Sequence, residues 1–184
     1  MIKQLLTESR ALPLSYFKGL NFLLNEQPDK AIEAFIEVVK VDPQTIELHF
    51  ALGSLFRRRG EVERAIRMHQ NLVERPDLAQ DRKLHALFEL AQDYLKAGLL
   101  DRAEELFLKL DGTPHAESAL RFLLEIYEQE KDWEKAIGIA GKLETLTGQS
   151  HQKEIANFCC EIAGNEIMQS RPEAARPHLA KALE

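Results

Sequence analysis

The sequence predicts an all-α fold made of about five copies of one helix-turn-helix repeat, stacked as a right-handed solenoid. Residues 60–66 (Gly-Glu-Val-Glu-Arg-Ala-Ile) recur as residues 98–104 (Gly-Leu-Leu-Asp-Arg-Ala-Glu), and the similarity extends upstream to residues 51–56 and 89–94. Self-similarity at a fixed period is the signature of a repeat array, so we expect ten helices, two in each repeat, and no strand. The same frame is visible in three further segments, which are residues 15–35, 120–140 and, more weakly, 157–179.

The repeats are expected to follow one another along nearly the whole chain. Residues 1–11 are predicted as a lead-in and residues 12–184 as the array. Glycine is the favoured left-handed residue after a helix, so it marks the turns between the two helices of a repeat. These turns are expected at residues 27–28, Gly60, Gly98 and residues 130–132. The predicted repeats are 12–45, 46–83, 84–116, 117–155 and 156–184, the last of them truncated.

Each repeat carries small side chains at the expected contact between its two helices. A larger side chain at either position would push the helix axes apart and open a void beside it. The predicted pairs are Gly19 with Ala31, Gly53 with Ala65, Ala91 with Ala103, and Ala163 with Ala175, whereas Ala136 faces Leu124 in the fourth repeat.

The spacing of small and aromatic residues resembles the tetratricopeptide repeat, a helical hairpin of about 34 residues. The distance from Ala65 to Ala103 is longer, and so is that from Ala136 to Ala175. We therefore expect longer loops or lengthened helices near residues 76–83 and 146–151. The residues that carry the resemblance are Gly19, Phe22, Ala31, Phe35 and Pro43 in the first repeat and Leu52, Gly53, Phe56 and Ala65 in the second.

Three segments are more specific than a generic repeat requires. They are residues 55–70, which contain an arginine-rich turn followed by His69 and Gln70, and residues 97–104 and 154–161. In this order they resemble the bacterial lipopolysaccharide assembly protein B family. The similarity extends over most of the chain from about Tyr16.

This resemblance implies an adaptor on the cytoplasmic side of the inner membrane. Family members bring the deacetylase that commits to lipid A synthesis to a membrane-bound AAA+ protease, and so control how much lipopolysaccharide is made. They also carry an N-terminal membrane helix and a C-terminal rubredoxin-like module that holds iron or zinc. This sequence shows neither feature, so we interpret it as a fragment of the array, with membrane attachment and metal belonging to the parent protein.

The fragment interpretation has a consequence for the last helix. Leu179, Ala182 and Leu183 are expected to form an exposed apolar strip, because the next repeat is missing. Pro177 would interrupt the helix and favour fraying. If the last helix instead starts late, near Ala175, Pro177 would lie in the first turn of that helix.

Composition and charge exclude several classes of function. The chain has 184 residues, is 45% hydrophobic, and carries a formal net charge of −6, which argues against binding to nucleic acid. Cys159 and Cys160 are adjacent and form neither a disulfide framework nor a metal site, which indicates a reducing compartment. No run approaches the roughly 20 apolar residues of a membrane span. We therefore expect a cytoplasmic chain without a cofactor of its own.

No catalytic or metal-binding site is predicted. No two of the six histidines show the helical spacing of a metal-binding pair, and there is no phosphate loop or recognisable nucleophile. His69 stands where a phenylalanine is usual, so a packed, hydrogen-bonded imidazole is the favoured interpretation.

The concave face, lined by the first helix of each repeat, is the predicted partner-binding groove. Phe50 and Phe88, flanked by Arg57, Arg58 and Lys96, would suit an acidic peptide or helix with an apolar anchor. Simple packing of the two rings is the alternative. The full set of predicted groove residues is Tyr16, Phe50, Arg57, Arg58, Phe88, Gln92, Lys96 and Arg121.

Three functional classes stay open at this point. A protein–protein adaptor is favoured, a regulatory repeat domain of a larger enzyme is possible, and a peptide-binding co-chaperone is weakest. The co-chaperone interpretation needs Lys and Asn at groove positions where Phe50 and Ser54 stand. The sequence defines no oligomeric state.

Overall fold

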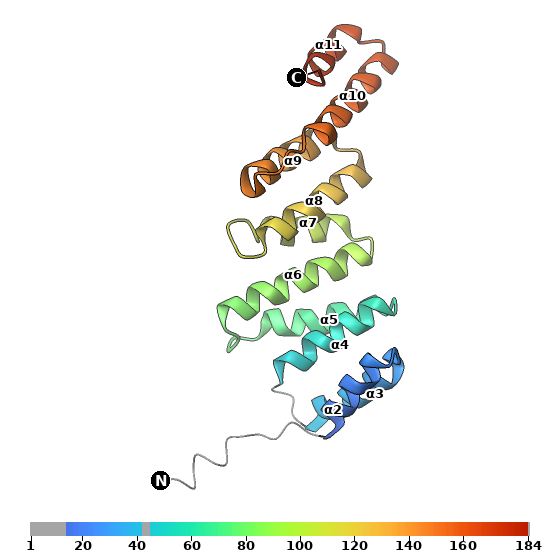
Figure 1. Ribbon diagram of the computed structural model, residues 1–184, viewed down its shortest axis with the longest axis vertical. Helices are drawn as coiled ribbons and strands as arrows, with labels where there is room; N and C mark the ends of the chain where they lie inside the picture. The colour runs from blue at the N-terminus through green and yellow to red at the C-terminus, as the bar shows by residue number, and fades with distance from the viewer. Residues whose placement is uncertain (1–13, 42–44, 184) are drawn as a thin grey trace. The chain divides into compact units, whose positions relative to one another are not determined.

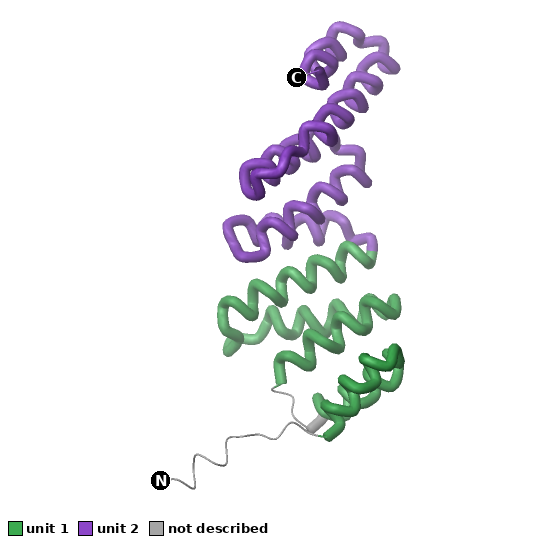
Figure 2. Tube along the Cα trace, viewed as in Figure 1, with its two compact units in different colours: residues 1–97 green, residues 98–184 purple. Residues whose placement is uncertain are grey.

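The structure, a computed structural model, describes residues 14–41 and 45–183 (Figure 1). Within these residues it contains ten helices and no strand, which confirms the predicted all-α fold. The chain divides into two compact units, unit 1 with residues 1–97 and unit 2 with residues 98–184 (Figure 2).

Unit 1 consists of two helical hairpins and one further helix. Consecutive helices pack against each other, and α4 also contacts α6. The core of the first four helices is apolar and contains Phe35, Leu48, Leu52 and Phe56. The helices are α2 (Leu14–Leu24), α3 (Pro28–Val41), α4 (Ile46–Arg58), α5 (Val62–Glu74) and α6 (Gln80–Lys96).

Unit 2 continues the same pattern with five helices. Neighbours along the chain again pack on one another, from α7 on α8 to α10 on α11. A stacked ring pair, Phe107 with Phe122, joins α7 to α8, and a second pair, Trp133 with Phe158, joins α9 to α10. The helices are α7 (Leu100–Leu108), α8 (Ala116–Glu130), α9 (Trp133–Thr147), α10 (Gln152–Met168) and α11 (Pro172–Lys181).

The turn inside each repeat contains one residue in the left-handed region. Gly60 has φ 78° and Gly98 has φ 73°, which confirms the conformation predicted for both. The corresponding turns of the other three repeats have residues with a side chain at this position, for which the left-handed conformation is sterically unfavourable. These residues are Glu26, Lys131 and Ser170, with φ values of 56°, 59° and 60°.

The predicted small residues are all buried, and the structure shows what they accommodate. A Cβ added to Gly19 would lie 2.3 Å from the ring of Phe35, and one added to Gly53 would lie 2.3 Å from Nε2 of His69. The glycine on the first helix therefore makes room for the side chain four residues after the buried alanine of the second helix. The buried alanines are Ala31, Ala65, Ala91, Ala103, Ala136, Ala163 and Ala175.

The extra residues between repeats lengthen helices. Helices α6 and α10, which follow the two predicted insertions, have 17 residues each, whereas α4 has 13. By contrast α7 has only 9 residues, and the buried Leu110 follows its end.

The last helix differs from the sequence-based expectation in two ways. Helix α11 begins at Pro172, so a late start near Ala175 is wrong, and Pro177 lies inside the helix. Pro172 fits the first position, where its missing N–H costs no hydrogen bond. Leu179 and Leu183 are exposed, as predicted, but Ala182 packs on the core formed by α9 and α10. Its small side chain reaches that core because α11 folds back on α10.

Candidate protein-binding surfaces

Phe50, one of the residues predicted to line the concave groove of unit 1, packs against the chain's own side chains. Phe50 is only 8% exposed, and its ring lies 4.6 Å from that of His85 and 6.0 Å from that of His69. Phe88 is half-buried. Phe50 therefore contributes mainly to the core around α5 and α6 rather than to an open anchor pocket.

Arg57 of α4 is held by two carboxylates of α6. Its Nη1 donates to Oδ1 of Asp93 at 2.6 Å, and its Nη2 donates to Oε2 of Glu89 at 2.8 Å. Ser54 also donates to Glu89, at 3.2 Å. The Arg57 side chain is 17% exposed, so its charge is largely used to join the two helices.

His69 of α5 completes this network from the other side. Its Nδ1 lies 2.5 Å from Oδ2 of Asp93, and both side chains are fully buried. A carboxylate only accepts hydrogen bonds, so Nδ1 of His69 is the donor. The prediction of a packed, hydrogen-bonded imidazole is confirmed.

The network changes the protonation behaviour of Glu89. Burial alone would raise its pKa, because it disfavours the charged form. The hydrogen bond and the positive charge of Arg57 outweigh burial, so the pKa of Glu89 lies below its usual value. Glu89 therefore stays ionised at neutral pH and pairs with Arg57 between α4 and α6, while the hydrogen bond from His69 to Asp93 adds α5 to the network.

The remaining predicted groove residues are spread over both units. Arg58 and Lys96 are exposed in unit 1, whereas Gln92 is half-buried and its Nε2 lies 3.4 Å from Oε1 of Glu89. Tyr16 is half-buried, with its ring 6.1 Å from that of Phe35. Partner binding by these residues stays a prediction. Arg121 lies in α8 of unit 2 and is paired with Glu117 on the same helix.

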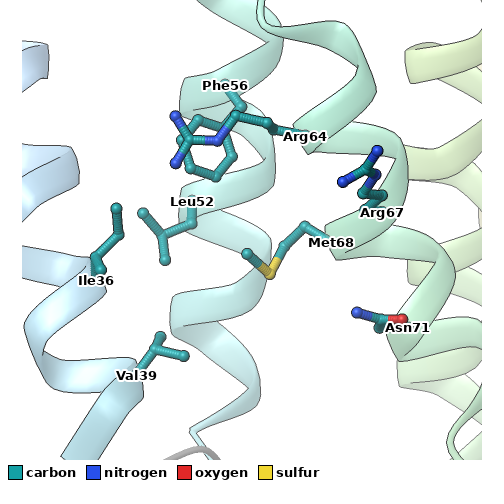
Figure 3. A pocket seen from close by; sticks show the side chains of 8 residues that line it. All are labelled: Ile36, Val39, Leu52, Phe56, Arg64, Arg67, Met68 and Asn71. Atoms are coloured by element: carbon teal, nitrogen blue, oxygen red, sulfur yellow. The ribbon is translucent and has the colours of Figure 1, made fainter.

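A second groove in unit 1 was not predicted from the sequence. It lies between α3 and α5 with α4 as its floor, and encloses about 590 Å³ (Figure 3). Residues 64, 67, 68 and 71 of α5 recur at helical spacing along one wall, and this spacing is the signal that could have revealed it. The lining residues are Ile36, Val39, Leu52, Phe56, Arg64, Arg67, Met68 and Asn71.

Unit 2 also contains a groove, but its lining is different. It lies beside α8 and α9 and includes Gly138 and Gly141, so part of its wall is bare helix backbone. The two charged residues of its lining, Asp111 and Lys142, pair with each other at 3.8 Å. This groove therefore offers a partner little net charge.

The described residues contain neither a metal-binding cluster nor a helix that could span a membrane. Among them, no three His, Cys, Asp or Glu side chains come together in a way that could hold a metal ion. None of the helices in this part of the chain has the length and apolar character needed to cross a membrane.

Comparison with known proteins identifies the family. The model of the tetratricopeptide repeat matches residues 18–76 and 88–149. The chain belongs to the tetratricopeptide-repeat family.

The resemblance to lipopolysaccharide assembly protein B is also confirmed by curated relatives. The protein of that name from Escherichia coli K12 is 46% identical over 157 residues, which cover 85% of this chain and 40% of the relative. The protein from Haemophilus influenzae is 40% identical over 184 residues, covering 95% of this chain and 46% of the relative. The chain thus spans less than half the length of these relatives.

Comparison with solved structures supports the helical repeat fold and says nothing about function. MamA superposes with a TM-score of 0.62 at 19% identity, covering 90% of this chain and 92% of that chain. A putative kinesin light chain with nearly identical repeats from Podosopora anserina gives a TM-score of 0.61 at 17% identity, covering 91% of both chains.

Proposed function

We propose that this chain is the repeat region of a protein–protein adaptor that regulates lipopolysaccharide synthesis. The observation that carries the proposal is the 46% identity with lipopolysaccharide assembly protein B over 157 residues. The partners are the deacetylase that commits to lipid A synthesis and a membrane-bound AAA+ protease. The chain contributes binding and positioning in this proposal, and no catalytic step.

The architecture supports a binding role. Tetratricopeptide arrays present extended surfaces on which a partner can lie, and each repeat contributes a few side chains to them. In unit 1 the exposed cations Arg58 and Lys96 flank the predicted groove, while Arg57 and Glu89 fix α4 against α6. A fixed scaffold with exposed charge at its margin suits recognition of an acidic partner.

Localisation and metal are part of the same proposal for the parent protein. It would face the cytoplasm from the inner membrane, to which an N-terminal helix would anchor it. Iron or zinc would bind to a rubredoxin-like module of the parent protein outside this chain.

A chimera tests the proposal in cells. The segment of the Escherichia coli relative that aligns with this chain is replaced by the chain itself, and the half-life of the deacetylase is measured after translation is stopped. We expect a half-life close to that in cells with the unaltered relative. A half-life as long as that in cells lacking the relative, at normal chimera abundance, would contradict the proposal.

The matched control separates fold from function. The same segment is replaced by the repeats of MamA, which share the fold at 19% identity. This control should leave the deacetylase long-lived, because the surfaces that recognise the partners differ. Restoration of turnover by both chimeras would mean that any array of this fold is sufficient.

The concave groove is tested by binding in solution. Arg58→Glu combined with Lys96→Glu removes the two exposed cations without disturbing the buried pairs of Arg57. Isothermal titration with the purified deacetylase should show weaker binding by this variant, and the loss should shrink with salt as charges are screened over about 10 Å at 0.1 M. Unchanged affinity would move the binding site to another surface.

A further inference from the structure

The groove between α3 and α5 combines a fixed floor with accessible walls. Leu52 and Phe56 of α4 form the floor and are 1% and 2% exposed, so the core holds them in place. Ile36, Val39 and Met68 form the walls and are only partly buried. Figure 3 shows Met68 reaching from α5 towards the α3 side of the groove. The apolar surface here is thus preformed and open to an incoming side chain.

The rim of this groove is positively charged on a chain whose net charge is −6. Arg64 lies over the ring of Phe56, with its Cζ 3.9 Å from the centroid, and also pairs with Glu61 at 2.5 Å. Arg67 is exposed and makes no ion pair with any described residue. Among the described residues, no acidic side chain lines the groove. A negatively charged partner would therefore find complementary charge at this edge.

The dimensions of the groove favour a helix as its occupant. Arg64 and Asn71 are seven residues apart on α5, which corresponds to about 10 Å or two helical turns. A partner helix covers this length with apolar residues at positions i, i+3, i+4 and i+7. A helix satisfies its own backbone hydrogen bonds, whereas an extended peptide would depend on the polar lining residues Arg64, Arg67 and Asn71 or on water for them.

We propose that the groove formed by α3, α4 and α5 is a docking site for an acidic amphipathic helix of a partner protein. The apolar face of that helix lies on Ile36, Val39 and Met68, and its acidic flank faces Arg64 and Arg67. The walls of the site belong to α3 and α5, the second helices of their repeats, and its lining shares no residue with the predicted concave groove. The proposal rests on the geometry and charge of this groove, and it is independent of the identity of the partner protein.

Designed peptides test the proposal on the full chain. The probe is a fluorescein-labelled peptide of about 18 residues, long enough to form a helix, with leucines at i, i+3, i+4 and i+7 and glutamates beside them. A matched peptide carries lysines in place of the glutamates. Fluorescence anisotropy at low salt should show roughly tenfold tighter binding of the acidic peptide, equivalent to about 1.4 kcal/mol.

Variants of the chain locate the binding to the groove. Arg67→Glu should reduce or reverse the preference for the acidic peptide, and Met68→Gln should weaken binding of both peptides. Lys153→Glu is the matched control, because it makes the same charge change at an exposed cation of unit 2, outside the groove lining. It should leave the preference for the acidic peptide intact. Circular dichroism confirms that each variant keeps its helix content.

Several outcomes would overturn the proposal. Equal effects of Lys153→Glu and Arg67→Glu would show that the peptide responds only to the general charge of the chain. Equal affinity for the two peptides would remove the role of the arginine rim. Self-association of the wild-type chain in sedimentation, abolished by Arg67→Glu, would show that a second copy occupies the groove instead of a partner helix.

Discussion

One position of the repeat is polar in the second repeat and apolar in the third. Four residues after the buried alanine of the second helix, α5 of unit 1 has His69 and α7 of unit 2 has Phe107, whereas α3 of unit 1 has the apolar Phe35. The next helix contributes Asp93 in unit 1 and, in the equivalent position of α8, Ile126 in unit 2. All five side chains are 0% or 1% exposed.

This difference separates two ways of joining successive repeats. In unit 2 a stacked pair, Phe107 and Phe122 with centroids 5.1 Å apart, fills the space by apolar contact. In unit 1 a fully buried pair, with Arg57 added, fixes one arrangement of three helices through directional hydrogen bonds. Burying charges costs desolvation energy, so such a network adds less stability than apolar packing, but loss of one member is costly.

The largest effect is expected when one member of the network is removed. Asp93→Ala leaves His69 and Arg57 without their shared acceptor, and should lower the free energy of unfolding by about 3–5 kcal/mol. Chemical denaturation followed by circular dichroism measures this loss. Amide hydrogen exchange should place the loss of protection in unit 1.

The matched control transplants the apolar pair of unit 2. In the double variant His69→Phe with Asp93→Ile, the phenylalanine faces Gly53 as Phe35 faces Gly19. Replacing both members of a buried hydrogen-bonded pair by apolar groups is often neutral or stabilising, so most of the lost stability should return. A double variant as unstable as Asp93→Ala would show that the polar network has no apolar substitute.

The second largest effect is expected at Gly53, whose lack of a side chain allows α4 to approach His69. In Gly53→Ala the new Cβ would lie 2.3 Å from Nε2 of His69, which Asp93 holds in place. Overpacking of this kind should cost about 1–3 kcal/mol. In α9 of unit 2, a Cβ on Gly138 would meet nothing within 4 Å. Gly138→Ala should therefore stabilise the chain by about 0.5–1 kcal/mol. Chemical denaturation of both variants measures the two changes.

A smaller effect is expected at the left-handed turns. Gly60 of unit 1 has open space around it, so the cost of Gly60→Ala comes from the backbone alone and should be about 1 kcal/mol. Lys131 of unit 2 has φ 59° with a side chain. Lys131→Gly should be neutral or slightly stabilising. Equal destabilisation by both substitutions would mean that the lysine side chain makes a contact worth keeping.

The smallest effects should appear as opposite responses to pH. Glu89 has a pKa below its usual value, so its contribution to stability is present above about pH 4.5 and is lost as the pH falls further. In unit 2, partial desolvation and the charges of Glu125 and Glu154 raise the pKa of Glu128. Ionised Glu128 is therefore unfavourable in the folded state.

Glutamine variants measure the two responses. At pH 7 Glu89→Gln should lower the melting temperature and Glu128→Gln should raise it slightly. The difference for Glu128 should be gone by about pH 4.5, because its raised pKa lets the folded chain take up the proton first. The difference for Glu89 should fade only below pH 4.5, as the pH approaches the lowered pKa of the folded chain. A shift in the same direction for both variants would contradict the opposite assignments.

The sequence by itself determined the repeat, and with it the fold class. The recurrence of residues 60–66 as 98–104 and the buried alanines such as Ala65 and Ala103 were sufficient, because helical periodicity and small contact residues are local signals. The left-handed turns at Gly60 and Gly98 followed in the same way, and so did the packed imidazole of His69.

Only the tertiary structure decided what the charged residues do. Arg57 lies more than thirty residues before Glu89 and Asp93 in the sequence, and no local pattern indicates that it meets them between α4 and α6. For the same reason the sequence suggested Arg57 as a partner-binding cation and did not reveal the groove of α3, α4 and α5. Pairing and grooves depend on which faces of separate helices come together, and that is fixed by packing rather than by periodicity.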